Sequence, residues 1–305
     1  MKNREWIAWL PLILIIGWWL YDLQFQWRAL VEYQFGWLVL VLTAYLVWER
    51  WSSIPTTDRP VSLWLSSAVV LMATPFVLVA ELYKQAIANT PAASFSLSIG
   101  CAFYVIANVL YLRGWKTFRH FLFPLAFFFL AVPLPGILWS PVVLALKETI
   151  TTLDVEALKL MGIPAVQQAN VIRLPNCTVG IDEACSGVRS LQSSIMAGLF
   201  IGNLTFKRWG SQATFLLVGI LLALTGNFLR SLYLSITAHR HGIEALERMH
   251  DAAGWSIFAF TAAGLSVVAW LVKRLEKRAE ERRTGILPVS VCRIRKGCAV
   301  GNRRD

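Results

Sequence analysis

Long apolar blocks separated by short polar stretches repeat along the whole chain. The blocks are roughly 16 to 25 residues long, which is the length that an α-helix needs to cross about 30 Å of hydrocarbon. Trp and Tyr gather at their edges, as they do at membrane interfaces. The pattern predicts an all-α polytopic transmembrane helical bundle of about eight spans, at residues 6–21, 33–48, 61–80, 94–112, 119–135, 186–202, 210–236 and 254–272.

The longest segment between two spans, residues 136–185, has a different pattern. Within it, residues 140–161 repeat apolar positions at helical spacing with charged residues between them, which predicts a helix lying on the membrane surface. Residues 166–181 favour short extended pieces around a Pro-Asn turn. We therefore expect one long segment outside the membrane, made of a surface helix and short extended pieces, that leads into the sixth span.

Composition and charge agree with this picture and add a direction. Apolar residues make up 56% of the 305 positions and charged residues only 15%, which excludes an ordinary soluble domain. With the N-terminus inside, the predicted inner segments hold 20 Lys and Arg and the outer ones hold 7, so both termini are expected in the cytoplasm. We expect residues 1–273 to form the transmembrane domain and residues 274–305 a basic, disordered tail.

Two alternative interpretations of the basic and N-terminal segments are less favoured. No folded basic module is visible, so nucleic-acid binding is not expected. No small-residue cleavage site follows the first apolar run, so we expect an uncleaved span there rather than a secretory signal.

A cysteine and an arginine stand where the sixth span begins. Ser186 and Gly187 suit a helix start, which would place Cys185 at the positive end of a helix dipole, where a thiolate is stabilised. Arg189 follows four residues later on the same face, and Glu183 precedes the cysteine. The alternative is a small buried cysteine, with the arginine reaching to the lipid headgroups.

Two more polar positions lie at the same predicted depth. Arg230 stands near the outer end of the seventh span with Asn227 three residues before it, and His250 precedes the eighth span, one turn before Gly254. Each can also be explained alone, as an arginine reaching to the headgroups or an interfacial histidine. Together, a thiol, a guanidinium and an imidazole at one outer face are what acyl transfer through a thioester needs.

At these positions the chain resembles the exosortase/archaeosortase family of membrane-embedded cysteine transpeptidases. The motifs that carry the resemblance are ACSGVRSL (184–191), NFLR (227–230) and HDAAG (250–254). The family pattern implies Cys185, Arg230 and His250 as the catalytic set. Arg189 and Asn227 match other recurrent positions, and Glu183, Ser186 and Gly254 are expected to support the site.

The resemblance also implies partners and a location. The substrates would be exported proteins with a C-terminal sorting signal, made of a short motif such as Pro-Glu-Pro, a membrane helix and a basic cluster. The acceptor would be an envelope polysaccharide or lipid, and no cofactor or metal is implied. The site would face the periplasm from the bacterial inner membrane.

Three alternatives stay open on the sequence. His239, His241 and His250 could belong to a membrane metalloprotease, although the first two lie two residues apart and point to different faces of a helix. The chain could instead be a non-enzymatic transporter or scaffold for exopolysaccharide export. A disulfide between Cys177 and Cys185 would mask the proposed nucleophile.

Overall fold

The expected all-α fold is confirmed. The computed structural model describes residues 5–54, 61–181 and 187–284, without the side chains of residues 5–8, 250, 251 and 280–284. Its long helices are α1 (Glu5–Ala29), α2 (Gly36–Trp51), α3 (Leu63–Ala86), α4 (Pro91–Phe128), α5 (Gly136–Leu160), α6 (Val188–Thr205), α7 (Trp209–His241) and α8 (Ile243–Thr284). Two 3-10 turns, η2 (Val31–Tyr33) and η3 (Phe129–Ala131), precede α2 and α5.

Five stretches of the described residues are long and apolar enough to cross a membrane. They are Val31–Trp51, Leu63–Ala86, Pro91–Ala131, Trp209–His241 and Ala252–Ala279. The stretch of 41 residues over α4 and η3 contains the predicted span 94–112 and most of the span 119–135, whereas α1 and α6 do not meet the same criteria. The chain is therefore polytopic, and the count of eight spans stays a prediction.

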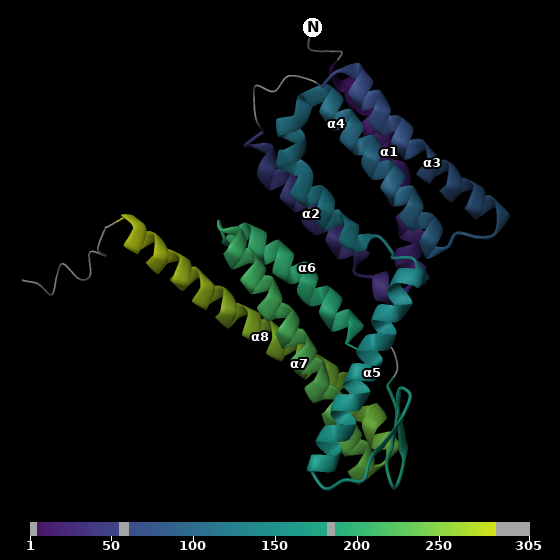
Figure 1. The fold of residues 1–305 in the computed structure, drawn as a ribbon, viewed down its shortest axis with the longest axis vertical. Helices are drawn as coiled ribbons and strands as arrows, with labels where there is room; N and C mark the ends of the chain where they lie inside the picture. Colours follow the sequence, from purple (N-terminus) through teal and green to yellow (C-terminus); the bar gives the residue numbers. More distant parts are fainter. Residues whose placement is uncertain (1–4, 55–60, 182–186, 285–305) are drawn as a thin grey trace, which may run out of the picture.

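Helix α4 folds back on itself at Gly114. This residue has φ +83° and ψ −174°, which no helix contains and which glycine adopts without a steric penalty. Trp19 of α1 contacts both legs of α4, because its Nε1 donates to Ser98 at 2.8 Å and its ring packs edge-on against Phe128. The two legs therefore return to one level, and they are visible side by side in the upper part of Figure 1.

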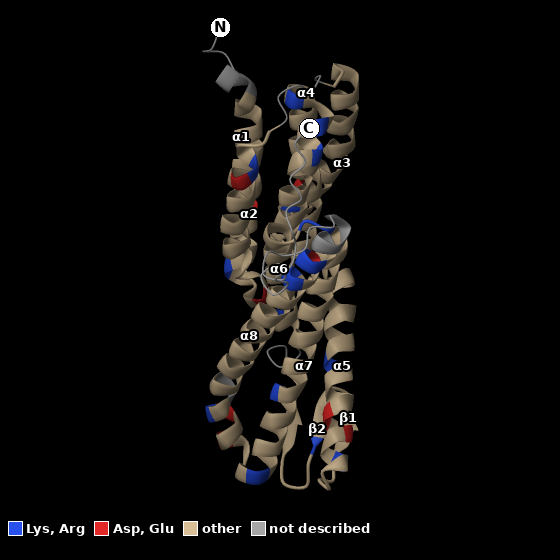
Figure 2. Ribbon diagram, turned by 90° about the vertical axis from the view of Figure 1, so that its left-hand side faces the viewer, with Lys and Arg blue, Asp and Glu red and all other residues tan. Residues whose placement is uncertain are grey.

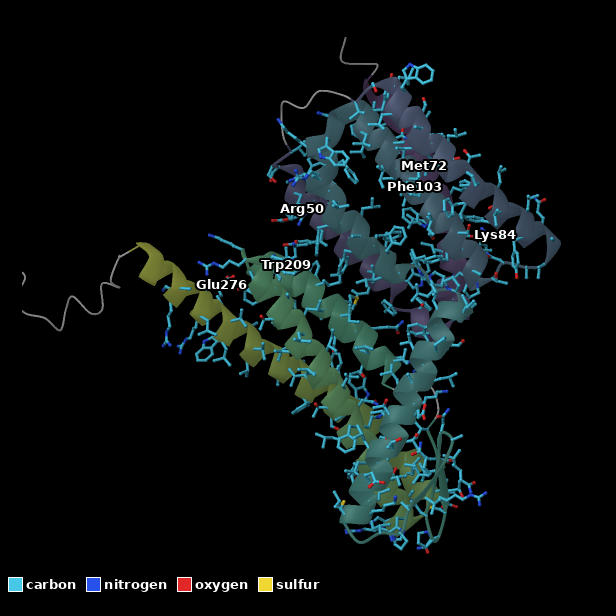
Figure 3. The ribbon with its side chains drawn as sticks, viewed as in Figure 1. Arg50, Met72, Lys84, Phe103, Trp209 and Glu276 are labelled. Carbon is cyan, nitrogen blue, oxygen red and sulfur yellow. The ribbon has the colours of Figure 1, made fainter. Side chains whose placement is uncertain are left out.

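The first four helices form an N-terminal bundle with a continuous apolar core. Trp27 of α1 is almost fully buried in this core and donates from Nε1 to the Ala131 carbonyl at 2.7 Å. Near the end of the bundle that faces α5, Lys84 pairs with the buried Asp22 at 2.5 Å. Figure 3 marks Lys84 close to the end of α3. This ion pair joins α1 to α3.

At the opposite end of the N-terminal bundle, one arginine connects three helices. Arg50 of α2 donates to the His120 carbonyl of α4 at 2.8 Å and to Asn203 Oδ1 of α6 at 2.9 Å. The ring of Phe200 on α6 also packs against Tyr45 of α2. These contacts attach α6, and with it the C-terminal helices, to the N-terminal bundle (Figures 1 and 3).

Each of the helices α6, α7 and α8 runs antiparallel to the one before it, and glycines at their contacts allow them to pack closely. A Cβ atom at Gly198 would lie 3.0 Å from Leu216 of α7, and one at Gly226 would lie 3.0 Å from Ile257 of α8. The 33 residues of α7 are about 50 Å long at 1.5 Å per residue, well beyond the roughly 30 Å of a hydrocarbon core. The C-terminal third of α7 therefore projects out of any membrane that its N-terminal part crosses.

That projecting part belongs to a separate lobe with a small sheet. Strands β1 (Val166–Gln168), β2 (Val171–Arg173) and β3 (Thr178–Gly180) form an antiparallel sheet in the order β1-β2-β3. Its buried side chains, among them Ile172 and Val179, share an apolar core with α5 and the end of α7. Figure 1 shows this lobe at the lower end of the molecule. The predicted extended pieces are thus three short strands.

Helix α5 is the helix that the sequence predicts at residues 140–161, and its position on the membrane surface stays a prediction. It forms where expected, and its C-terminal half packs against the end of α7 and buries Val155 and Leu158 there (Figure 1). The side of α5 that carries Val155 and Leu158 is covered by protein, whereas other apolar residues of the helix, among them Ile137 and Leu160, are exposed. Figure 2 shows the charged residues of this region in the lowest part of the molecule, around β1, β2 and the ends of α5 and α7.

The last helix is longer than its predicted span. Helix α8 continues beyond residue 273 to Thr284, so the first part of the predicted basic tail is helical. Arg274 lies over the ring of Trp270 with its Cζ 3.7 Å from the ring centroid, an arrangement that suits the interface of a membrane. Residues 285–305 of the predicted tail lie outside the described residues.

Candidate functional site

Parts of three helices meet at one level, where α6 begins and where α7 and α8 enter the lobe. A Cβ atom at Gly187, just before α6, would lie 2.7 Å from Nδ2 of Asn227 on α7. A Cβ atom at Gly254 of α8 would lie 3.7 Å from Nη2 of Arg230, one turn further along α7. The structure therefore brings together four of the positions that the sequence motifs contain.

Gly187 sets the start of α6, as predicted from the sequence. It has φ +83°, which is open to glycine and strained for other residues, and its carbonyl accepts from Leu191 N at 2.9 Å and Ser190 Oγ at 2.8 Å. Glu183, Cys185 and Ser186, which precede it, lie outside the described residues. The backbone N–H groups of the first turn of α6 point out of the N-terminal end of the helix, where they would stabilise an anion.

Asn227 and Arg230 lie on adjoining sides of α7. Asn227 is only 2% exposed, facing α6, whereas Arg230 is half-buried and lies beside α8. About 20 residues of helix cross the hydrocarbon, so a membrane whose inner surface is near Trp209 would end near Leu229. Arg230 then stands at the boundary between lipid and the lobe.

Helix α8 carries the other two predicted positions. His250 lies within the helix, and its side chain lies outside the described part of the structure. Gly254 follows one turn later next to Arg230. The 3.7 Å between a Cβ atom at Gly254 and the Arg230 guanidinium is an ordinary van der Waals separation, so an alanine would fit there.

Arg189 differs from the other arginine of the motifs. Its side chain is exposed on the first turn of α6, whereas Gly187 faces the Asn227 side chain. The expectation that Arg189 shares a face with Cys185 stays a prediction. An exposed arginine in this place agrees with the alternative in which its side chain reaches to the headgroups.

A buried acid next to the site was missed in the sequence. Asp154 of α5 is fully buried, and its Oδ2 accepts a hydrogen bond from Oγ of Ser231, the residue after Arg230. Burial, the larger effect, raises the pKa of Asp154 to about 7, against the lowering effect of the Ser231 hydrogen bond. The sequence signal was present, since Asp154 lies between the apolar positions of its helix, but a surface helix gave no reason to bury it.

The histidines of the metalloprotease alternative do not converge in the described part. His239 is half-buried near the end of α7 and His241 is exposed, as their spacing of two residues predicts. Among the residues that the structure describes, no three His, Cys, Asp or Glu side chains are grouped so that they could hold a metal ion.

Cys177, the possible disulfide partner of Cys185, lies between β2 and β3. It is half-buried and is not bonded to Cys101, the other cysteine of the described ranges. Burial raises the pKa of the Cys177 thiol above its usual value, which disfavours the reactive thiolate at this position. A bond between Cys177 and Cys185 is not tested by these observations.

Comparison with known proteins identifies the family. The model of the transmembrane exosortase family matches residues 27–267, which is most of the chain and includes all the motifs described above. The comparisons with curated proteins and with solved structures returned no match. The matched region runs from the end of α1 into α8 and so covers α2 to α7, the lobe and the first part of α8. The chain therefore belongs to the transmembrane exosortase family.

Proposed function

We propose that this protein is a cysteine transpeptidase that cleaves C-terminal sorting signals of exported proteins at the outer face of the bacterial inner membrane. One observation carries the proposal. The start of α6, two residues after Cys185, lies against Asn227, and one turn along α7 the Arg230 guanidinium lies beside Gly254. The three motifs thus share one level, although they are separated by about 40 and 20 residues of sequence.

The chemistry divides among three side chains. His250 takes the proton of the Cys185 thiol, and the thiolate sulfur attacks the carbonyl carbon of the scissile peptide. Arg230 stabilises the oxyanion that forms, with five N–H donors that carry a permanent charge. The C–N bond then breaks, the leaving amine takes the proton from His250, and a thioester to Cys185 remains.

An acceptor resolves the thioester. A hydroxyl or amine of an envelope polysaccharide or lipid attacks the thioester carbon, and its proton passes to His250. The C–S bond breaks and the thiolate is restored, so that the exported protein is joined to the acceptor. The amides and the helix dipole at the start of α6 stabilise negative charge. They therefore favour the Cys185 thiolate both before its attack and after its release from the thioester.

The level of the site suits a substrate that is itself anchored in the membrane. A sorting signal with a membrane helix would present the preceding motif where its helix leaves the hydrocarbon. Arg230 lies at that depth by the length of α7. The basic cluster that follows such a helix would remain on the cytoplasmic side.

The test is processing of a tagged sorting-signal protein that is co-expressed with the full chain in a bacterial membrane. Cys185→Ala should abolish both cleavage and the thioester-linked fragment, and Arg230→Lys should lower the rate about 100-fold or more. Cys177→Ala is the matched control, since it removes another thiol eight residues earlier in the chain and should process normally.

Other outcomes would favour the alternatives. Full export function in the Cys185→Ala variant would contradict the proposal and support a transporter or scaffold. Loss of processing on adding a chelator, with recovery on adding zinc, would support the metalloprotease. Nonreducing mass mapping that found Cys177 joined to Cys185 in the active protein would also overturn the mechanism, because the nucleophile would be absent.

A further inference from the structure

The hydrogen-bond pattern of the small sheet leaves one edge facing outward. In β2 and β3, Leu174 N donates to the Cys177 carbonyl and Ile181 N donates to the Asn170 carbonyl, both at 2.9 Å. Hydrogen-bonded and non-hydrogen-bonded pairs alternate along an antiparallel ladder. Thr178 and Gly180, which lie between these positions, therefore direct their N–H and C=O groups away from β2.

This outer edge of β3 is open in the described part of the structure. β3 is the last strand in the order β1-β2-β3, and no described backbone group hydrogen-bonds to Thr178 N or Gly180 N. Both residues are exposed, and a Cβ atom at Gly180 would have no atom within 4 Å. Val179 between them is buried in the lobe, so the edge is held firmly.

An edge of this kind fits one class of partner. Alternating outward donors and acceptors match the backbone of an extended polypeptide, which can add to the sheet as a further strand. The neighbouring strand contributes charge, because the exposed Arg173 is directly opposite Thr178 in the register. An added segment with an acidic side chain on the same face would gain from this cation.

The place of β3 in the chain connects this edge to the proposed site. The strand ends at Gly180, and Cys185 follows within five residues, before α6 begins at Val188. The lobe lies beyond the part of α7 that crosses the membrane, on the side where Arg230 emerges. A substrate segment paired with β3 would therefore run close to the candidate catalytic residues.

We propose that the β3 edge binds the extended segment of the exported protein that adjoins its scissile bond, as an added β-strand. This inference rests on the proposed function and specifies how the substrate is held. Backbone pairing supplies affinity that does not depend on sequence, while Arg173 adds a preference for an acidic side chain. The edge is only three residues long, so the pairing contributes to KM more than to the chemical step.

Proline substitution tests the edge at two positions with matched controls. Thr178→Pro and Gly180→Pro each remove one outward N–H without removing a hydrogen bond to β2. Thr178→Val and Gly180→Ala change the same side chains but keep the N–H. With a tagged sorting-signal protein as substrate, each proline variant should raise KM about tenfold, and each control should stay within about twofold of the wild type.

A second measurement does not depend on cleavage. In the full chain with Cys185→Ala, a photo-reactive side chain at Thr178 should cross-link to substrate residues next to the scissile bond, and one at exposed Val166 on the opposite strand should not. Arg173→Gln should raise KM for a substrate with acidic residues there and leave KM unchanged when those residues are replaced by glutamine.

The outcomes separate the two proposals. If the wild type cleaves and the proline variants match their controls, or if Thr178 forms no cross-link, the edge does not bind substrate although the proposed function stands. If the wild type does not cleave, the proposed function fails, and the cross-link alone then decides whether β3 docks the exported segment. A proline variant with an unchanged unfolding temperature and a raised KM supports the edge.

Discussion

Asp154→Asn should remove a pH dependence from the stability of the protein. Asp154 is fully buried between α5 and α7, its Oδ2 accepts from Ser231, and Oδ1 has no hydrogen-bond partner among the described residues. Burial, opposed by the Ser231 hydrogen bond, raises the pKa of this carboxyl to about 7 from an ordinary value of 3.8. The folded protein therefore keeps a proton that the unfolded chain has already lost.

The size of the pH effect on stability follows from the difference between the pKa values of Asp154 in the folded and unfolded states. Well below pH 3.8 both states are protonated and burial has no ionic cost. As the pH rises toward 7 the unfolded chain binds fewer protons than the folded protein, so stability falls by up to about 1.4 kcal/mol per pH unit. The loss is about 3 kcal/mol between pH 5 and pH 8 and levels off above the folded-state pKa.

The assay is thermal unfolding of the purified full chain in detergent across this pH range. The wild type and Asp154→Asn differ only at this side chain, so the difference between their two curves reports on the Asp154 carboxyl. The wild-type midpoint should drop by several degrees more than that of the variant. Parallel curves from pH 5 to pH 8 would refute the assignment of a buried neutral acid.

Ser231→Ala independently checks the direction in which the Ser231 hydrogen bond shifts the pKa of Asp154. The hydrogen bond from Ser231 lowers the pKa of Asp154, so its removal should raise that pKa further. The fall in stability should then extend to higher pH than in the wild type. A shift toward lower pH would show that the hydroxyl stabilises the neutral form instead.

Three further predictions concern packing in the bundles. Gly187→Ala should lower stability by about 1–3 kcal/mol because of its φ of +83° and the side chain 2.7 Å away, while Gly254→Ala, with 3.7 Å of space, should be neutral in thermal unfolding. Lys84→Met should cost about 3–5 kcal/mol by leaving Asp22 buried without its cation, and adding Asp22→Leu should recover much of this; a double variant no better than the single one would contradict the argument. Cys101, fully buried, should react with maleimide only after denaturation, as mass spectrometry would show.

Hydropathy predicted the helices well because lipid leaves the backbone few choices. Where no water is available, each crossing segment must satisfy its own hydrogen bonds, so an apolar block becomes a helix. The block at 33–48 is α2, the one at 61–80 is α3, and the start predicted at 186–187 is the start of α6. The polar stretch between the fourth and fifth predicted spans is helical too, with a single break at Gly114.

Partners across the fold were not predictable in the same way. Periodicity identifies which face of a helix is apolar but not what covers it, so the packing of α5 on α7 and the sheet was not predicted. Asp154 and Ser231 are 77 residues apart, and no spacing rule joins them. The same holds for Arg50 and Asn203, which join α2 to α6.

Some features of the candidate site could be predicted from the sequence and others could not. Counting spans was enough to expect Asn227, Arg230 and Gly254 near one boundary, because the helices alternate in direction. The contact of Gly187 with Asn227 depends on a left-handed backbone at one residue, which the motif alone does not specify.

The length of α7 has a consequence for the lipid around the protein. Arg230 sits about 20 residues, or roughly 30 Å, from the exposed Trp209 where the helix begins, so its position matches one thickness of bilayer. Lipids with longer acyl chains would draw the guanidinium into hydrocarbon unless the helix changed its tilt, and shorter ones would leave it in headgroups and water. Acyl-chain length in reconstituted vesicles should therefore change the rate of the processing that we propose. The rate should be highest where the hydrocarbon ends at Leu229.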